Sequence, residues 1–344
     1  MFRTDEPGTS DFRPLQPATF ARSEARYRSS GLPVTVVQKK AAAAKGRNDT
    51  PALQDWSLPT ATYLYRDPSA ATLQWDTIAS YLHDTLGIPC EVRNEFFSLF
   101  GRKDRENLAR RIAATKVRHI QRPFEVMQSL YGEVQFERRL LEEPSKRVPG
   151  ILYDGYRYAT FLRDLLPPME RNLRLIHIVF AHRLLGTFDE DGRYHARAVV
   201  CSVPSVVSTS GIVEGPAKPK EYYIVKAQLS IALGAVPFEA AKQPFAGKFI
   251  DYDDPRLTEV AKGYALQAAM YHITHEPFCE DESCRLFNAH WQSELIESQI
   301  ESGRLCARHE AKAAGIRRMG GRSRTTRKNR SPRTGAGEGP RKAL

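Results

Sequence analysis

The pattern of hydrophobic and polar positions divides the chain into a patterned middle and two ends without any period. Residues 58–314 carry strand-like and helix-like periodicities, whereas residues 1–57 and 315–344 are rich in arginine, serine, glycine, proline and alanine. Segments of that composition cannot bury enough apolar surface to offset the entropy of ordering. We therefore predict a disordered N-terminal segment at 1–57, a disordered basic tail at 315–344, and a folded body between them, divided into portions 58–170 and 171–314.

The portion 58–170 follows a β-α-β-α order. Residues 61–67 alternate as in a strand, and residues 72–87 place Trp75, Ile78 and Leu82 on one face of a helix that ends at Gly87. A second strand at 90–100 and a basic helix at 102–120 follow. Because β-α-β units usually join parallel neighbouring strands, we expect a partly parallel sheet.

The portion 171–314 supplies the centre of that sheet. Residues 173–185 are nearly continuously apolar, which is typical of a strand buried on both faces. A turn at Asp191 and Gly192 leads to a predicted partner strand at 195–208, and a helix follows near 224–232. A last helix is predicted to begin at Asp254 as N-cap, with Pro255 in its first turn. The fold class that we predict is α/β, with a mixed sheet and flanking helices.

The cysteines are concentrated after that helix. Cys279 and Cys284 form a Cys-x4-Cys pair, and 21 residues later Cys306 and His309 form a Cys-x2-His pair. Two tight ligand pairs on either side of a helix-length spacer are typical of a tetrahedral zinc site, and we predict a C-terminal Cys3His zinc knuckle. The spacer helix is predicted to have Asn288 as N-cap and Gly303 as its stop. His290 could replace His309 as fourth ligand, and the alternative to zinc is a set of buried free thiols.

This arrangement resembles the archaemetzincins, a metzincin-related family of metalloproteases. In that family a helix carrying H-E-x-x-H-x-x-G-x-x-H leads into C-x4-C, a spacer and C-x2-C. The resemblance implies a metzincin-like fold and a cysteine-bound zinc ion. The segments 177–223 and 271–292 also look like a prokaryotic family described as metallopeptidases.

The catalytic part of the archaemetzincin motif is degenerate in this chain. The first histidine and the glutamate fall on Ala268 and Ala269, and the third histidine falls on Phe278. Only the second histidine is kept, as His272, while His275 occupies the glycine position and Leu286 that of the methionine after the second cysteine. A peptidase zinc needs about three protein ligands and a base for its water, so the sequence predicts no standard peptidase activity.

Two further groups of residues are weaker candidates for a site. His272, His275 and His290 could hold a second metal with Glu276 as base, which would make the protein a metal-dependent hydrolase; the alternative is that they are helix-end residues. A ligand-binding group could form at strand ends, where the alternative is turn and strand-edge chemistry. Its members are Arg193, His195, Ser208, Thr209 and Glu214. If the cleft is not catalytic, we expect it to bind a polypeptide or another ligand.

The net charge of +11 belongs to the ends of the chain. Residues 316–344 contain ten Lys/Arg and one acidic residue, Glu338, so the body is nearly neutral. The tail could make weak, salt-dependent contacts with nucleic acid, but it has no aromatic residue to stack on bases. No apolar run is long enough for a bilayer and no secretory leader stands out, so we predict a cytoplasmic protein without a membrane partner.

Overall fold

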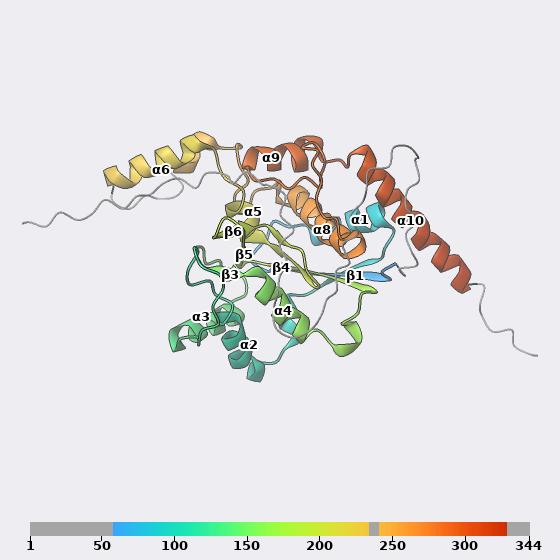
Figure 1. Ribbon diagram of the computed structural model, residues 1–344, viewed down its shortest axis with the longest axis horizontal. Helices are drawn as coiled ribbons and strands as arrows, with labels where there is room; N and C mark the ends of the chain where they lie inside the picture. Colours follow the sequence, from blue (N-terminus) through green and yellow to red (C-terminus); the bar gives the residue numbers. More distant parts are fainter. Residues whose placement is uncertain (1–57, 234–240, 329–344) are drawn as a thin grey trace, which may run out of the picture.

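A five-stranded mixed sheet forms the centre of the computed structural model, which describes residues 58–233 and 241–328, with side chains to residue 320 (Figure 1). The strand order is β2-β1-β4-β8-β7. The strands are β1 (Ala61–Tyr65), β2 (Cys90–Arg93), β4 (Leu175–Ala181), β7 (Val199–Val200) and β8 (Ser205–Ser208). All neighbours are parallel except β7 and β8. The predicted α/β class is confirmed, and the apolar strand β4 is central.

A smaller sheet joins β3 (Leu152–Asp154), β5 (Leu184–Phe188) and β6 (Tyr194–Arg197). β5 and β6 form the predicted antiparallel hairpin, whose turn contains Gly192 with φ of 79°. The single partner strand predicted at 195–208 is wrong, because the segment is divided among β6, β7 and β8, and β8 pairs with β4 in parallel. Pro204 lacks an N–H for a ladder, and the chain turns there to reverse direction between β7 and β8.

Helices cover both faces of the main sheet (Figure 1). On one side lie α1 (Trp75–Leu86), α8 (Leu257–Thr274) and α10 (Ala307–Lys328); on the other lie α2 (Arg105–Ala113), α3 (Tyr131–Glu142) and α4 (Gly155–Leu165). Successive side chains of a strand point to opposite faces, so Leu64 belongs to the core under α1 and α8 while Tyr65 belongs to the core under α2 and α4. Both residues are fully buried.

Short elements complete the described chain. The single turns are η1 (Phe96–Leu99), η2 (Arg102–Asp104), η3 (Pro168–Glu170) and η4 (Gln243–Phe245). The remaining helices are α5 (Thr209–Glu214), α6 (Lys220–Leu233), α9 (Gln292–Ile296) and the π-helical η5 (Glu297–Ser302). Helix α6 extends away from the sheet (Figure 1). No helix among residues 58–233 and 241–328 is long and apolar enough to cross a membrane.

Several predicted boundaries are displaced. Helix α8 begins at Leu257 rather than at Asp254, because the Asp254 carboxylate accepts the backbone N–H of Arg256 and holds a turn before the helix. The second strand ends at Arg93, since Phe96 and Phe97 turn into the core as part of η1. Helix α10 continues to Lys328, past the predicted start of the tail at 315, because Ile316 still packs in the core. The predicted disorder of residues 1–57 and 329–344 lies outside the described residues.

Candidate metal centre

Three segments converge on the four predicted zinc ligands. Helix α8 ends where His275 adopts a left-handed conformation, with φ of 59°, and the chain then passes directly to Cys279. The loop from Cys279 to Phe287 closes on itself, as the Cys279 N–H donates to the Leu286 carbonyl over 2.9 Å. Cys306 immediately precedes α10, and His309 lies in its first turn. The two ligand pairs therefore come from a loop and a helix start that face one another.

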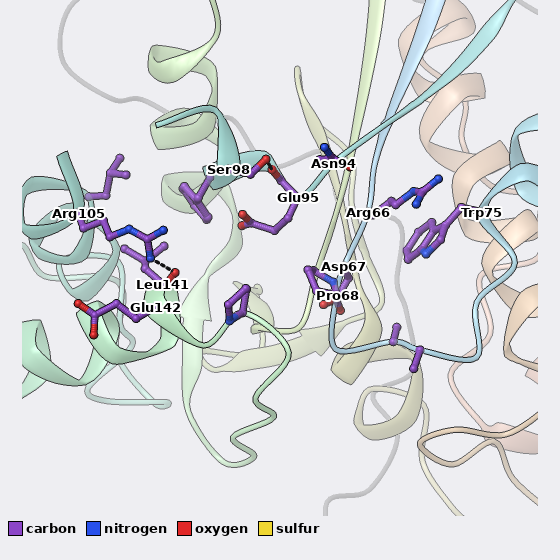
Figure 2. Close-up of a pocket in the computed structure, with 15 residues that line it drawn as sticks. Arg66, Asp67, Pro68, Trp75, Asn94, Glu95, Ser98, Arg105, Leu141 and Glu142 are labelled. Atoms are coloured by element: carbon purple, nitrogen blue, oxygen red, sulfur yellow. Dashed lines mark hydrogen bonds between the residues drawn. The ribbon is translucent and has the colours of Figure 1, made fainter. Parts of the chain in front are cut away.

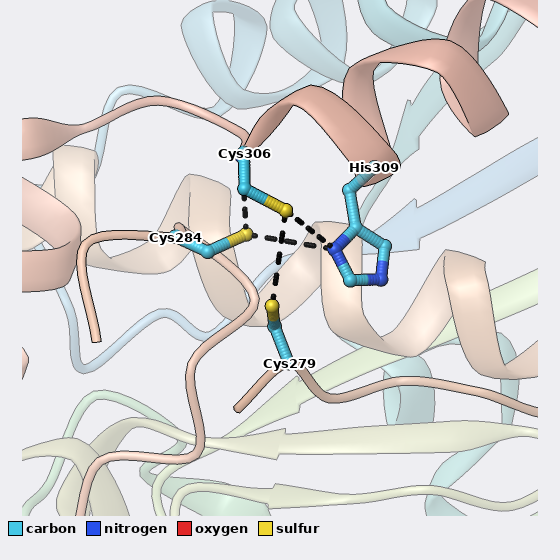
Figure 3. A group of neighbouring side chains, drawn as sticks. All are labelled: Cys279, Cys284, Cys306 and His309. Atoms are coloured by element: carbon cyan, nitrogen blue, oxygen red, sulfur yellow. Dashed lines mark hydrogen bonds between the residues drawn. The ribbon is translucent and has the colours of Figure 1, made fainter. Parts of the chain in front are cut away.

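The ligand atoms have the spacing of a tetrahedral site (Figure 3). Cys279 Sγ and Cys306 Sγ are 3.9 Å apart, Cys284 Sγ is 3.7 Å from His309 Nδ1, and Cys306 Sγ is 3.2 Å from the same nitrogen. All four atoms lie within 4.8 Å of one another. Zn–S bonds of about 2.3 Å and a Zn–N bond of about 2.0 Å give a tetrahedron with edges of about 3.5–3.8 Å. The donor set and its spacing thus fit a zinc ion, and the prediction that these four residues form one cluster is confirmed.

Burial around the cluster favours a cation. Cys284 and His309 are fully buried, and burial raises the pKa of the Cys284 thiol to about 12. Burial also acts to raise the pKa of Cys306, but hydrogen bonds from the His309 backbone, the Cys284 and Cys279 side chains and the Arg308 backbone together lower that pKa. A thiolate is the form that binds metal, so a bound dication would supply the charge that holds the buried thiols deprotonated.

Backbone N–H groups already point at two of the sulfur atoms. Asp281 N lies 3.4 Å from Cys279 Sγ, and Cys306 N lies 3.4 Å from Cys284 Sγ. Burial and the neighbouring Lys312 and Arg308 lower the pKa of His309, which keeps the imidazole in the neutral form that ligates metals. Its Nδ1 faces the sulfurs, while its Nε2 is buried without a partner among the described residues. These features support Nδ1 as the ligand atom.

A buried polar pair that sequence patterns did not reveal supports the loop between the two cysteines. Gln299, from η5, donates to the Arg285 carbonyl over 2.8 Å, and Arg285 in turn donates to Glu259 on α8 over 3.2 Å. Gln299 and Arg285 are almost fully buried. The only signal in the sequence was Gly263, an unusual residue for a helix interior, whose missing side chain makes room for Gln299.

The structure does not bring the three histidines of the possible second metal site together. His272 Nε2 lies 2.9 Å from the Leu173 carbonyl, and His275 caps α8 with its ring against Tyr271. Glu276 is paired with Lys312 and Arg308 on α10, and the His290 backbone donates to Glu294 over 2.7 Å. Within residues 58–233 and 241–320, Cys279, Cys284, Cys306 and His309 are the one group of three or more potential ligands close enough to share an ion.

The predicted ligand-binding residues are placed in turns and caps. Arg193 and His195 both bind Asp191 in the hairpin turn, over 2.7 and 2.9 Å. Ser208 caps α5 by accepting the Gly211 N–H. Thr209 donates to Asp67 over 2.5 Å, and Glu214 accepts a hydrogen bond from Tyr252. This placement corresponds to the alternative of turn and strand-edge chemistry.

The fold and the cluster define an α/β protein with a Cys3His site of the zinc type. Residues 58–316 match the model of the Probable metallopeptidase family (DUF6775), and the chain belongs to this family. No curated protein matches the sequence. Among solved structures, a zinc-dependent peptidase from Methanocorpusculum labreanum is similar over 73% of this chain and 99% of its own, with 10% identity and a TM-score of 0.30. That score is too low to support conclusions about this fold or its activity.

Proposed function

We propose that this protein is an archaemetzincin-related member of its metallopeptidase family in which one zinc ion has a structural role and standard peptidase activity is absent. The observation that carries the proposal is the closed ligand set. Cys279, Cys284, Cys306 and His309 provide four protein ligands within 4.8 Å of one another. A catalytic zinc keeps a position open for water, whereas a structural zinc has all four positions filled by protein.

Helix α8 supports the second half of the proposal. By resemblance this helix would carry the catalytic histidine and glutamate at Ala268 and Ala269, and both alanines are fully buried in the core. An alanine can neither ligate a metal nor take a proton from water. The remaining histidine, His272, forms a hydrogen bond with the Leu173 carbonyl through its Nε2 atom.

The partner that we propose is a polypeptide, because the description of the family points to proteins that act on peptide chains. We place the protein in the cytoplasm, where unpaired thiols persist, since all five cysteines are free in the structure. The basic end of the chain adds weak and nonspecific attraction for nucleic acid in this proposal, which salt would screen.

Elemental analysis of zinc tests the proposal directly. The wild type and a His272→Ala/His275→Ala variant are both expected to contain one zinc per chain, because neither histidine belongs to the Cys3His cluster. Two zinc ions in the wild type that fall to one in the variant would instead support a metal-dependent hydrolase using His272, His275 and His290 with Glu276. Cleavage of a peptide library by the zinc-loaded wild type, abolished in the double variant, would overturn the non-catalytic assignment.

A further inference from the structure

A cavity of about 570 Å³ lies on a different part of the molecule from the zinc cluster, at the carboxyl ends of β1 and β2 (Figure 2). Arg66 and Asp67 follow β1, and Asn94 and Glu95 follow β2. In open parallel sheets this edge is where ligands bind, because the loops that leave neighbouring strands diverge there. The volume lies within the range of small-molecule sites, which is about 300–1,000 Å³.

Two side chains of opposite charge line this cavity, and neither forms a direct ion pair with a described residue. The Arg66 guanidinium makes no hydrogen bond or ion pair with any described residue, and its Nε is buried. Glu95 likewise forms no ion pair within the described part of the chain. Burial raises the pKa of its carboxyl group, while the backbone N–H groups of Phe97 and Ser98 and the charge of Arg183 act to lower it. Figure 2 shows the Glu95 carboxylate pointing towards the side of Arg105 and Leu141, while the Arg66 guanidinium lies on the other side of the cavity beside Trp75. An unpaired, partly desolvated charge is costly, so each group favours a ligand that supplies its counterpart.

The surrounding residues hold these two groups in place. The Asp67 carboxylate accepts hydrogen bonds from the Ser69 hydroxyl and from the Thr209 hydroxyl on α5. These bonds fix the end of β1, and they leave Asp67 unavailable to a ligand. Arg105 donates to the Leu141 carbonyl, which fixes the opposite wall. A ligand with both charges would therefore meet a preformed site.

The remaining walls are apolar. Trp75 lies on the β1 side of the cavity, with its ring edge-on to Phe180 at 5.1 Å, and Phe97, Leu108 and Leu141 lie on the other side. Phe97, Leu108 and Leu141 are buried residues of the core, so they present fixed surfaces. A small ligand with an apolar side chain would gain contact area here in addition to its two charge pairs.

We propose that this cavity binds a small zwitterion of the amino acid or dipeptide class, with its carboxylate on Arg66, its ammonium on Glu95 and an apolar side chain against Phe97 and Leu141. Arginine offers a carboxylate two parallel hydrogen bonds, and an ionised glutamate accepts from an ammonium. The inference goes beyond the proposed function, because the site lies at another part of the sheet and needs no zinc.

Isothermal titration calorimetry with the dipeptide alanyl-leucine tests the inference on the full-length protein. The free dipeptide is expected to bind, and its C-terminal amide and its N-acetyl derivative should each bind at least about tenfold more weakly, because each lacks one charge. Equal binding of the three compounds, or no binding of the free dipeptide at millimolar concentration, would overturn the proposal. This comparison uses the wild type alone, so it decides the question even if a variant fails to fold.

Substitutions of Arg66 and Glu95 test which ligand charge each of these residues binds. Arg66→Gln should remove the preference for the free carboxylate and Glu95→Gln that for the free ammonium, while Arg66→Lys should retain part of the affinity. The matched control is Arg102→Gln, an exposed arginine in the nearby η2 that does not line the cavity. Wild-type affinity and selectivity in Arg66→Gln would contradict the assignment. Zinc content should stay at one per chain in every variant, so a failure here leaves the zinc proposal intact.

Discussion

At the scale of single residues, the four members of the Cys3His cluster are unequal in their surroundings. Cys284 and His309 are fully buried, whereas Cys279 and Cys306 retain partial exposure. Without metal, the buried pair would leave a thiol and an imidazole in a closed space with few polar partners. The ion therefore matters most for the inner pair, while the outer pair determines how accessible the site is to chelators.

Substitution of the ligands provides the first residue-scale prediction. Cys284→Ser and Cys279→Ser should both lose the zinc ion and more than about 4 kcal/mol of stability, because metal binding is coupled to folding of the loop. Cys90→Ser is the matched control, since Cys90 lies in β2 outside the cluster. Zinc content and thermal unfolding check the result. An unchanged zinc content in the two ligand variants would refute the structural role.

His177 provides a pH-dependent prediction. This residue of β4 is 2% exposed, lies between the Tyr65 hydroxyl and the Glu170 carbonyl, and has a pKa that burial lowers to about 4. Nearby Glu170 acts to raise that pKa, while Arg93 and His272 act to lower it. As the pH falls below 6.5, this histidine is protonated in the unfolded state but stays neutral in the folded state. The free energy of unfolding is therefore highest above pH 6.5 and decreases towards pH 4.

The expected loss from His177 is at most about 3 kcal/mol at low pH. Denaturant unfolding as a function of pH should show this slope in the wild type and a smaller slope in His177→Asn. Equal slopes in the two proteins would show that other groups cause the acid sensitivity.

The cluster of Cys279, Cys284, Cys306 and His309 was predictable because the spacing of these residues alone indicates it. A Cys-x4-Cys pair and a Cys-x2-His pair can close around one ion whatever their surroundings. The roles of Arg285 and Gln299 were not predictable, because their burial depends on how α8 and η5 meet, which no local pattern records. The cavity at Arg66 and Glu95 escaped prediction for the same reason, since its two charges come from loops after different strands.

At the scale of elements, the contact between α8 and η5 determines the position of the zinc loop. A side chain at Gly263 would place its Cβ 1.8 Å from Gln299 Oε1, and Gln299 holds the Arg285 carbonyl next to Cys284. The close approach of the two elements therefore requires glycine at this point of α8. Within a helix, alanine is normally more favourable than glycine. At position 263 this gain in helix propensity is opposed by the clash with Gln299.

Gly263→Ala should consequently destabilise the protein by about 1–3 kcal/mol, because the clash outweighs the gain in helix propensity. Gly315→Ala in α10 is the matched control, since its Cβ would meet its nearest heavy atom only at 4.0 Å. That variant should be neutral or more stable by up to about 1 kcal/mol. Chemical denaturation of both variants measures the difference, and equal stabilities would contradict the tight contact at Gly263.

Element boundaries were less predictable than element types. The helix at 72–87 was recognised because apolar spacing and Gly87, with φ of 71°, mark its face and its end. The segment 195–208 was assigned to one strand because its alternation continues past Pro204, and only the tertiary pairing separates β6, β7 and β8. Asn288 was expected to cap the spacer helix, but α9 begins at Gln292 after Trp291, where the Glu294 carboxylate accepts the N–H groups of His290 and Trp291.

At the scale of the whole molecule, the loop that carries the Cys3His cluster connects α8 with α10, which are also joined by the ion pairs of Glu276 with Arg308 and Lys312. Helix α10 reaches α1, where Ile316 packs in the core and Arg317 donates to the carbonyls of Asp84 and Thr85. The zinc cluster holds the beginning of the same helix beside the end of α8. The C-terminal helix is thus fixed at both ends of its packed segment.

Removal of zinc by a chelator should therefore loosen one region and leave the rest in place. Hydrogen exchange is expected to accelerate over residues 279–316, while β1, β4 and β8 remain protected, because the sheet is stabilised by its own buried residues. Addition of zinc should restore protection. Uniform acceleration across the sheet would show instead that the ion stabilises the entire fold.

The pairing of β1 with β4 also determines when the sheet can form during synthesis of the chain. Ala61 pairs with Leu175, so β1, the first strand of the described residues, must wait for more than a hundred further residues before its central partner exists. The metal ligands Cys306 and His309 appear later still. A nascent chain that has reached α8 but not α10 can pair β1 with β4, but it lacks Cys306, His309 and the core residues Ala313 and Ile316, so the surface that these residues cover remains available to chaperones or proteases. In the proposed function, zinc binding would thereby mark the chains whose synthesis has reached α10.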